Sequence, residues 1–288
     1  MKTKPLHSAA QPPAITPMQR AIGTSKLAFE HDNLQTFYQS GSAKAFLPKT
    51  YNQTLEAVLV NTAGGMAEGD QFNHEIDICA KSHVTVTTQT AERVYGAVGT
   101  GAATLSVKLN ARDASHLHWL PQETILFENA RLHRKIEAHL DADSSLMMLE
   151  MIVFGRTAMR EYLTTGCYND QWRIYREGQL VHAEAVAMEG DLAGHLGDDA
   201  SMASHLSMAT FVYLAVDAQA RCDEAQRHFA APSPTKPAIN PVINSAVSAW
   251  HDKLVIRSLA LNHAAHKKRF QTFLKSFRQI DNPRVWNL

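Results

Sequence analysis

The sequence lacks the features that would place the protein in a membrane or in an oxidising compartment. No apolar run approaches the ~20 residues that a membrane-spanning helix needs. The three cysteines, Cys79, Cys167 and Cys222, lie far apart and form neither a CxxC motif nor an even-numbered disulfide framework. Residues 1–18 contain four prolines and no apolar core, so they are not a secretory signal. We therefore expect a cytoplasmic protein in which residues 1–24 form a flexible tail.

The chain also lacks an excess of charge of either sign. Lys and Arg together number 28, as do Asp and Glu, and charged residues make up 19% of the 288 residues. Without a net field to attract phosphate groups, we expect binding to neither nucleic acid nor a membrane surface. Hydrophobic residues make up 45% of the chain, which is typical of a globular protein with a sizeable core. We expect residues 25–288 to form a single domain.

Common nucleotide-binding and hydrolase motifs are absent as well. The glycine-rich segment 61–70, NTAGGMAEGD, contains no Gly-Lys-Ser/Thr and no Gly-x-Gly-x-x-Gly pattern, and the residues that follow it alternate like a strand. A turn between two strands therefore explains this segment better than a phosphate-binding loop does. No Gly-x-Ser-x-Gly nucleophile motif and no HExxH zinc motif occurs.

Alternating apolar residues predict a mainly β protein. This period of two extends from Lys26 to about Val216, and Val84 to Thr87 has favourable strand composition. The segment from Trp172 to Ala183 is typical of a hairpin, with Glu177-Gly178 at its turn.

A regular interval of 31 residues separates three alanines, Ala80, Ala111 and Ala142. Each alanine follows alternating apolar residues and precedes a short polar turn. Such a repeat predicts a layered or β-helix-like stack of short strands, although evenly spaced strands could also produce the interval by coincidence.

Two α-helices are predicted towards the C-terminus. The segment 217–231 lacks β-branched residues, and apolar residues fall at helical spacing from about Ser258 to Ile280. A proline-rich connection at 232–241 separates the two. The exposed side of the second helix is predicted to be basic, and a solvated helix face explains this better than phosphate binding does; its residues are His266, Lys267, Lys268, Arg269, Lys275 and Arg278.

Four carboxylates and one His-x-His pair are candidate ligands for a nickel or zinc ion. The carboxylates occur within or at the ends of β-like runs, and the two imidazoles would lie on one side of a strand; the six residues are Asp70, Glu92, Glu150, Glu161, His116 and His118. No recognisable metal-motif spacing supports the imidazole pair, and a structural or incidental role explains it better than metal binding does. Glu150 interrupts an apolar run, where a buried charge needs either a wet channel or an ion pair, for instance with Arg156.

The order of several motifs along the chain is informative. NTAGGMAEGD is followed by TTQTAERVY at 87–95, WLPQETILF at 119–127, FGRTAMRE at 154–161, DQWRIYR at 170–176 and PRVW at 283–286. From about residue 25 to its C-terminus, the chain resembles the urease accessory protein UreD family, called UreH in some organisms. Three positions depart from the family pattern. Glu68 and Arg160 stand where glycine is common, and Gly96 stands where a larger polar residue is expected.

This resemblance implies a non-enzymatic protein with a β-rich, helically wound fold and two α-helices. UreD-like proteins pair with UreF, recruit the GTPase UreG, dock on apo-urease and assist nickel insertion into its active site. On this basis we expect no stably bound cofactor, and nickel in transit past the six candidate ligands, because weak ligands release an ion as readily as they bind it. A β-solenoid enzyme acting on carbohydrates and a nickel-storage protein are the alternatives, and 8% aromatic residues offer few side chains to stack on sugars.

The C-terminal region is the expected binding site for the UreF-like partner. Between Trp250 and Trp286 the chain has more apolar residues than one core-facing helical stripe requires. The expected partner-binding residues are Trp250, Leu254, Phe270, Phe273 and Phe277.

Overall fold

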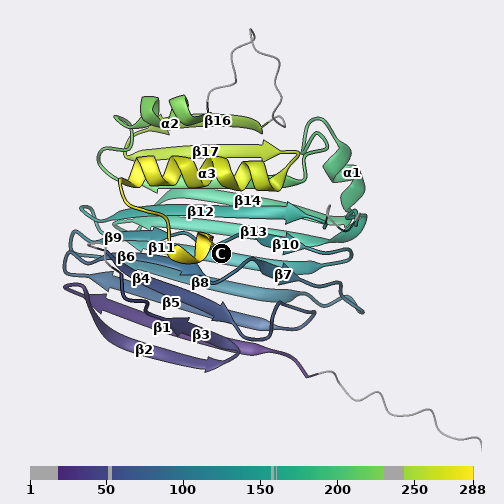
Figure 1. Ribbon diagram of the computed structural model, residues 1–288, viewed down its shortest axis with the longest axis horizontal. Coiled ribbons are helices and arrows are strands. Elements are labelled where there is room, and N and C mark those ends of the chain that lie inside the picture. Colours follow the sequence, from purple (N-terminus) through teal and green to yellow (C-terminus); the bar gives the residue numbers. More distant parts are fainter. Residues whose placement is uncertain (1–18, 51–53, 157–158, 160, 230–242, 288) are drawn as a thin grey trace, which may run out of the picture.

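Two β-sheets packed face to face form the body of the protein, and helices cover one outer face (Figure 1). The computed structural model describes residues 19–50, 54–156, 159, 161–229 and 243–287. Most of the expected tail therefore lies outside the described residues, and the first strand, β1, begins at Ile22. The proline-rich connection expected at 232–241 also lies outside them.

Within the described residues, sheet A has seven strands and sheet B has ten. In order across sheet A they are β14 (Gln179–Asp191), β13 (Thr165–Arg176), β11 (Arg131–Leu140), β8 (Ala103–Ala111), β5 (Gln71–Cys79), β1 (Ile22–Glu30) and β2 (Asn33–Gly41). Across sheet B they are β16 (Ile243–Trp250), β17 (Lys253–Ala260), β15 (Ser207–Leu214), β12 (Ser145–Phe154), β9 (His116–Trp119), β6 (His83–Thr88), β4 (Leu55–Asn61) and β3 (Ala43–Phe46), with β10 (Thr124–Leu126) joining β12 to β7 (Glu92–Val94). The prediction of a mainly β protein is confirmed.

The chain passes repeatedly from one sheet to the other, so that its successive turns stack as in a β-solenoid. In sheet A, β5, β8, β11 and β13 are neighbouring parallel strands. In sheet B, β4, β6, β9 and β12 are also parallel neighbours. Each strand turns one face towards the other sheet, which produces the period of two in the sequence. The predicted stack of short strands is confirmed.

The interval of 31 residues is nevertheless not the structural repeat. Ala111 in β8 pairs with Ile78 in β5 and with Leu140 in β11, which are 33 and 29 residues away. Ala80 lies in the turn after β5 with a φ of 52°, and Ala142 lies beyond the end of β11. Pairing and inward-facing side chains fix the register of a strand, whereas turns accept extra residues. The even spacing of the alanines is therefore a coincidence within a real stack.

Strands β13 and β14 form the predicted hairpin. Glu177 and Gly178 connect them, with φ values of 50° and 72°. Positive φ at both positions is typical of a two-residue type I′ turn, which matches the twist of the flanking strands.

The described residues contain three α-helices where the sequence predicts two. α2 (Cys222–Phe229) lies within the first expected helix, and α3 (His263–Arg278) forms the main part of the second. The additional α1 (Leu192–Gly197) is a short helix directly after β14. None of these helices is long and apolar enough to cross a membrane, as judged over the described ranges.

The predicted start of the second helix, about Ser258, is wrong. Ser258 to Ala260 belong to strand β17, where they pair with both β15 and β16. The helix begins later because the side chain of Asn262 accepts a hydrogen bond from the backbone N–H of Ala265 at 2.9 Å. It ends at Gln279, which adopts a left-handed conformation.

Strand β12 is buried on both faces, because it lies between sheet A and the helices. Leu146 and Met148 point towards sheet A, while Met147, Leu149 and Met151 pack beneath α3. A strand that is covered on both sides needs no polar alternation, which explains its continuous apolar sequence. Glu150 is the exception in this strand.

Candidate functional site

The glycine-rich segment 61–70 is a structural turn between β4 and β5, as the sequence predicts. Gly64, Gly65 and Gly69 have positive φ values of 79°, 153° and 83°. A Cβ atom at Gly65 would lie 2.4 Å from the ring of Tyr95 and 2.9 Å from the carbonyl oxygen of Arg93. Glycine is required at position 65 because its neighbours leave no room for a side chain.

Asp70 ends this turn and holds it against the beginning of β1. Its Oδ1 atom accepts a hydrogen bond from the backbone N–H of Ala21, and its Oδ2 atom accepts one from Ala67, both at 2.7 Å. The side chain is buried. A metal ion bound by Asp70 would have to compete with these two bonds.

Glu68, which stands where the resemblance leads us to expect glycine, anchors a second loop. Its carboxylate accepts backbone N–H bonds from Val98, Gly99 and Gly101 at 3.1, 2.7 and 2.8 Å. The bonds from Gly99 and Gly101 lower the pKa of Glu68. A glycine at position 68 would leave these three donors without this acceptor.

The structure also accounts for the second departure, at Gly96. A Cβ atom at this position would lie 2.5 Å from the carbonyl oxygen of Glu128. A larger polar residue would therefore require the backbone to move. The third departure, Arg160, lies outside the described residues.

Glu92 borders a small cavity between the two sheets. The cavity has a volume of about 100 Å³, and Asn61 and His74 contribute to its lining. The side-chain amide of Asn61 donates to Glu92 Oε1 at 3.1 Å, and Nδ1 of His74 lies 2.7 Å from the Ser25 hydroxyl. Burial raises the pKa of Glu92 to about 7 and lowers the pKa of His74 to about 4. At neutral pH the cavity therefore contains a neutral imidazole and a carboxyl group near its titration midpoint.

A buried network of charged and aromatic side chains surrounds Glu150 and joins the two sheets. Arg134 in sheet A donates to Glu150 Oε2 at 2.5 Å and to both oxygens of Asp170 at 2.9 and 2.6 Å. Trp119 Nε1 donates to Glu150 Oε1 at 2.7 Å, and Trp172 Nε1 donates to Asp170 Oδ1 at 3.0 Å. The three charged side chains are at most 5% exposed.

Hydrogen bonding favours the ionised form of Glu150. Burial raises the pKa of this carboxyl group, while Arg134 and the indole N–H of Trp119 oppose the rise. Both carboxylate oxygens accept bonds from N–H groups, which cannot accept a proton in return. The site therefore holds a carboxylate anion that is paired with a guanidinium cation.

The ion pair predicted between Glu150 and Arg156 is wrong. Arg156 forms an ion pair with Glu161 instead, and Glu161 Oε1 also accepts the backbone N–H of Glu128 at 3.2 Å. Glu150 points inwards, whereas Arg156 lies beyond the end of β12. Of the two explanations for a buried Glu150, the ion pair is therefore the one that holds. Its cation is Arg134, which belongs to the facing sheet.

His118 lies under α3, and His116 lies on the same side of β9 but is exposed; both are apart from the carboxylates. His116 Nδ1 lies 2.7 Å from the hydroxyl of Ser145, and His118 Nδ1 accepts a hydrogen bond from Arg278 Nε at 3.2 Å. The ring of His83 makes edge contacts with both imidazoles. Among the residues that the structure describes, no three His, Cys, Asp or Glu side chains are placed to hold a metal ion. The candidate ligands are thus distributed over the glycine turn, the inner cavity, the buried network, the surface and the space under α3.

Four of the five expected partner-binding side chains belong to the core. Leu254, Phe270, Phe273 and Phe277 are at most 1% exposed. The ring centroid of Phe229 in α2 lies 5.0 Å from the ring centroid of Phe270 and 5.2 Å from the ring centroid of Phe273. The apolar side of α3 is wide because it packs against both sheet B and α2, so these residues are not surplus to the core. Trp250, which is 42% exposed, remains a prediction for partner binding.

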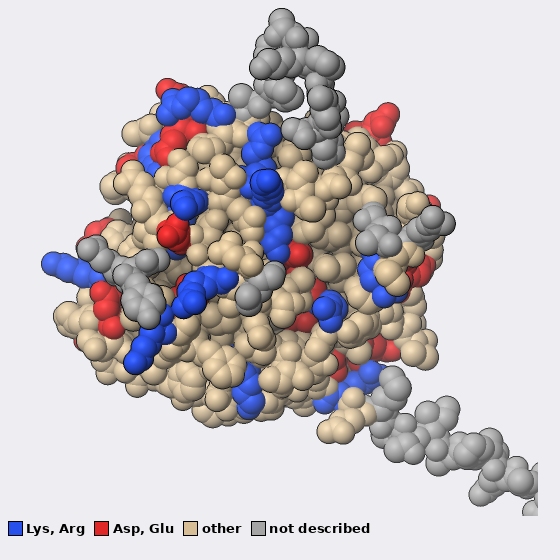
Figure 2. Space-filling model, in the orientation of Figure 1, with Lys and Arg blue, Asp and Glu red and all other residues tan. Residues whose placement is uncertain are grey.

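The basic side of α3 is also less exposed than the sequence predicts. His266 is completely buried, and Arg278 is 9% exposed. Figure 2 shows the face that carries α3, on which Lys and Arg lie among Asp and Glu with uncharged surface between them. A short column of Lys and Arg side chains runs down the upper middle of this view, and the other charged side chains are scattered.

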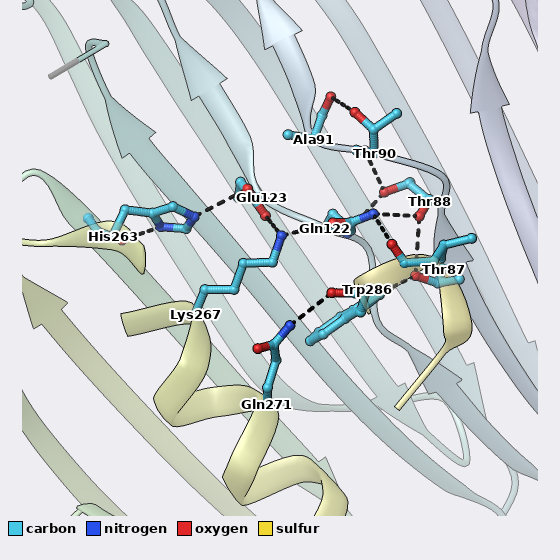
Figure 3. Close-up of polar contacts among 12 residues, drawn as sticks. Thr87, Thr88, Thr90, Ala91, Gln122, Glu123, His263, Lys267, Gln271 and Trp286 are labelled. Atoms are coloured by element: carbon cyan, nitrogen blue, oxygen red, sulfur yellow. Dashed lines mark hydrogen bonds and ion pairs between the residues drawn. The ribbon is translucent and has the colours of Figure 1, made fainter. Parts of the chain in front are cut away.

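The WLPQET segment at 119–124 holds α3 against sheet B (Figure 3). Lys267 in α3 donates to Gln122 Oε1 at 2.8 Å and lies 2.8 Å from Glu123 Oε2. His263 Nε2 lies 3.3 Å from the other oxygen of Glu123. Although burial alone would raise it, bonding to His263 and Lys267 lowers the pKa of Glu123 to about 2. The WLPQET segment therefore anchors the C-terminal helix.

The same area holds the C-terminal residues. Trp286 Nε1 donates to the hydroxyl of Thr87 at 2.9 Å, and Gln271 in α3 donates to the backbone oxygen of Trp286 at 3.1 Å (Figure 3). Trp286 is buried, so the PRVW segment closes the outer core.

Sequence reasoning missed four residues that shape these sites: His74, Arg134, Gln122 and Lys267. His74 and Arg134 carried a signal, because each occupies an inward position in an alternating strand where the neighbouring inward residues are apolar. Gln122 lies in a motif of the resemblance and Lys267 in the expected basic helix side, but the sequence did not show that the two meet, because their contact depends on how α3 packs against sheet B.

We predict that Arg134→Met destabilises the protein by about 3–5 kcal/mol, because it leaves two carboxylates buried without their cation. The control is Lys135→Met, on the opposite face of the same strand. The side chain of Lys135 is 61% exposed. This substitution should change stability by less than about 0.5 kcal/mol. Urea unfolding followed by circular dichroism measures both. A loss below about 1 kcal/mol for Arg134→Met would contradict the role given to the network.

We predict that Glu92→Gln stabilises the protein at alkaline pH. The pKa of Glu92 is raised from 4.5 to about 7, so its contribution to stability is present below pH 4.5 and lost as pH rises through 7. Gln cannot ionise and does not pay this penalty. The variant should therefore gain on the order of 1–3 kcal/mol over the parent between pH 5 and pH 8. If the free energies of unfolding of the two proteins change equally with pH over this range, the raised pKa of Glu92 is refuted.

Comparison with known proteins agrees with the motif order and the fold. The family model described as "UreD urease accessory protein" matches residues 22–287. A Rhodopseudomonas palustris protein is 38% identical over 273 residues, covering 93% of each chain. A Rhizobium leguminosarum bv. viciae protein is 34% identical over 96% of this chain and 98% of its own, and an Agrobacterium fabrum protein is 35% identical over 94% and 92%. All three are named "Urease accessory protein UreD", which is the name of an accessory protein and not of an enzyme. The chain belongs to the UreD family of urease accessory proteins.

Proposed function

We propose that this protein acts in the cytoplasm with a UreF-like accessory protein and the GTPase UreG, docks on apo-urease and assists nickel insertion into the urease active site. The observation that carries the proposal is the family match over residues 22–287. Family membership gives the chain a role in urease maturation as a protein that works with other proteins. The free thiols of all three cysteines are compatible with a reducing compartment.

A carbohydrate-active enzyme receives no support as an alternative. The stacked strands fit that class of fold, but the relatives are named accessory proteins and not enzymes. Fold alone does not imply a function.

Among the six candidate ligands, Glu92 best suits a nickel ion in transit. A water molecule takes up about 30 Å³ of liquid, so a cavity of about 100 Å³ has room for a partly hydrated cation. A carboxyl group with a pKa of about 7 releases its proton when a cation arrives and recovers it when the cation leaves. The neutral imidazole of His74 is a second possible ligand. This small and weak set of ligands suits passage better than storage.

We predict that Glu92→Gln lowers the nickel content of urease about three- to tenfold in cells that express the urease proteins at limiting nickel, by analogy with the effect of altering groups close to a metal site. Complex formation should be unchanged, because Glu92 lies between the sheets and Gln has the same shape. Nickel per urease is measured by mass spectrometry of the purified enzyme. The control is Glu189→Gln, whose side chain is 71% exposed and pairs with Arg131.

The two parts of the proposal can fail separately. Normal nickel loading with Glu92→Gln would remove Glu92 from the nickel route and leave the maturation role intact. Failure of the unaltered chain to associate with urease or with the accessory proteins would contradict the maturation role itself.

A further inference from the structure

A groove lies between the C-terminal half of α3 and the outer face of sheet B. Its volume is about 860 Å³, with Thr54 and His83 on the side of the sheet and Thr272, Ser276 and Gln279 on the side of the helix. Its lining also includes Lys275 and Asp281, which pair with each other at 2.8 Å, and Arg278 lies behind the lining. The groove is separate from the cavity at Glu92, which lies between the two sheets.

Side chains on adjacent strands of sheet B extend beneath the helix at this groove. Glu56 in β4 pairs in register with Thr85 in β6, and Thr85 pairs with His118 in β9. Arg278 in α3 donates to the Thr85 hydroxyl at 2.8 Å and to His118 Nδ1 at 3.2 Å. His83, which lines the groove, has its ring centroid 4.7 Å from that of His118. Arg278 thus contacts His118, and His118 contacts His83 in the lining of the groove.

Arg278 is a buried cation without an ion-pair partner. It is 9% exposed, and all 28 Asp and Glu residues of the chain lie in the described part. None of these carboxylates is within 4.0 Å of the Arg278 nitrogens. Its Nη1 atom has no hydrogen-bond partner among the described residues. A buried and unpaired guanidinium group is costly, so its surroundings are incomplete in the isolated chain.

Two further buried polar atoms near the groove lack a partner within the described ranges, namely Glu56 Oε1 and His83 Nε2. Three of the nine such atoms in the described residues therefore lie close to this groove, and because folded proteins leave few of them we read the three as the sign of a missing ligand. That ligand must offer an acceptor to Arg278 and a donor to Glu56. A small inorganic anion offers only acceptors and would leave most of the volume empty, whereas a polypeptide offers both kinds of group.

We propose that this groove binds an acidic segment of a protein partner, with an Asp or Glu carboxylate of that segment pairing with Arg278. The proposal rests on the proposed function, in which the partners of this chain are proteins. Backbone N–H groups of the segment supply donors for Glu56. Lys267, Gln122 and Glu123 fix α3 to the sheet, so the WLPQET motif also fixes the position of Arg278.

The first test fills the groove. Ser276 is an exposed residue in the groove wall, so Ser276→Trp occupies the space without removing a buried contact. Ala264→Trp is the matched control, at an exposed position 12 residues earlier and ~18 Å away along the same helix. The full chain is co-expressed with the UreF-like protein, UreG and apo-urease. We expect Ser276→Trp to reduce recovery of a partner about tenfold or more, and Ala264→Trp to leave it unchanged.

The second test identifies the carboxylate. We expect Arg278→Gln to weaken capture about tenfold or more, because it removes the buried cation from the complex. Arg278→Lys introduces an amine that a carbodiimide joins to a carboxylate in contact. Mass spectrometry of the assembled complex should then find a link between position 278 and an Asp or Glu of the partner. Circular dichroism confirms that each variant is folded.

The outcomes separate this inference from the function on which it rests. Unchanged capture by folded Ser276→Trp and Arg278→Gln, with the complex otherwise assembled, would overturn the inference and leave the maturation role standing. A carbodiimide link from position 278 to Glu56 alone would assign Arg278 to an internal ion pair and overturn it too. Micromolar binding of glutarate by the isolated chain, abolished in Arg278→Gln, would assign the groove to a small carboxylate instead. If the unaltered chain captures none of the three proteins, both proposals fail.

Discussion

The ion pairs between Arg134 and the carboxylates of Glu150 and Asp170 are the interaction on which the rest of the structure depends. Arg134 and Asp170 belong to sheet A and Glu150 belongs to sheet B, so the guanidinium group joins the two sheets directly. The network also separates two hydrophobic clusters, one around Met148 and Trp172 and the other around Ile152 and Tyr168. Desolvation offsets much of the attraction in a buried ion pair, so its main effect here is on register. A slip of β12 by one residue would turn Glu150 towards the apolar layer beneath α3.

A continuous series of contacts leads from this network to the groove at α3. Glu150 accepts the indole N–H of Trp119, which is the first residue of the WLPQET segment. Gln122 and Glu123 in that segment hold Lys267, and α3 then carries Arg278 over Thr85 and His118. The WLPQET segment thus connects the ion pairs inside the protein with the proposed partner site outside it.

The features that were predictable from the sequence are those set by local patterns. The alternation of apolar residues predicted the strands, Glu177-Gly178 predicted the hairpin, and the glycines of segment 61–70 predicted a turn. The partners of buried charges were not predictable, because Arg134 reaches Glu150 from the facing sheet and strand order determines which residues meet. The same reason explains why Phe270, Phe273 and Phe277 were expected at the surface. Their spacing shows a wide apolar side, but only the packed structure shows that sheet B and α2 share it.

The nickel content of urease in cells that lack this protein tests the central claim most directly. The gene is deleted from a urease-producing cell and restored on a plasmid, and urease is purified from both strains after growth at the same limiting nickel concentration. Our account predicts mostly nickel-free, inactive urease without the protein and nickel-loaded urease after its restoration. Urease that is equally loaded with nickel in both strains would contradict the account.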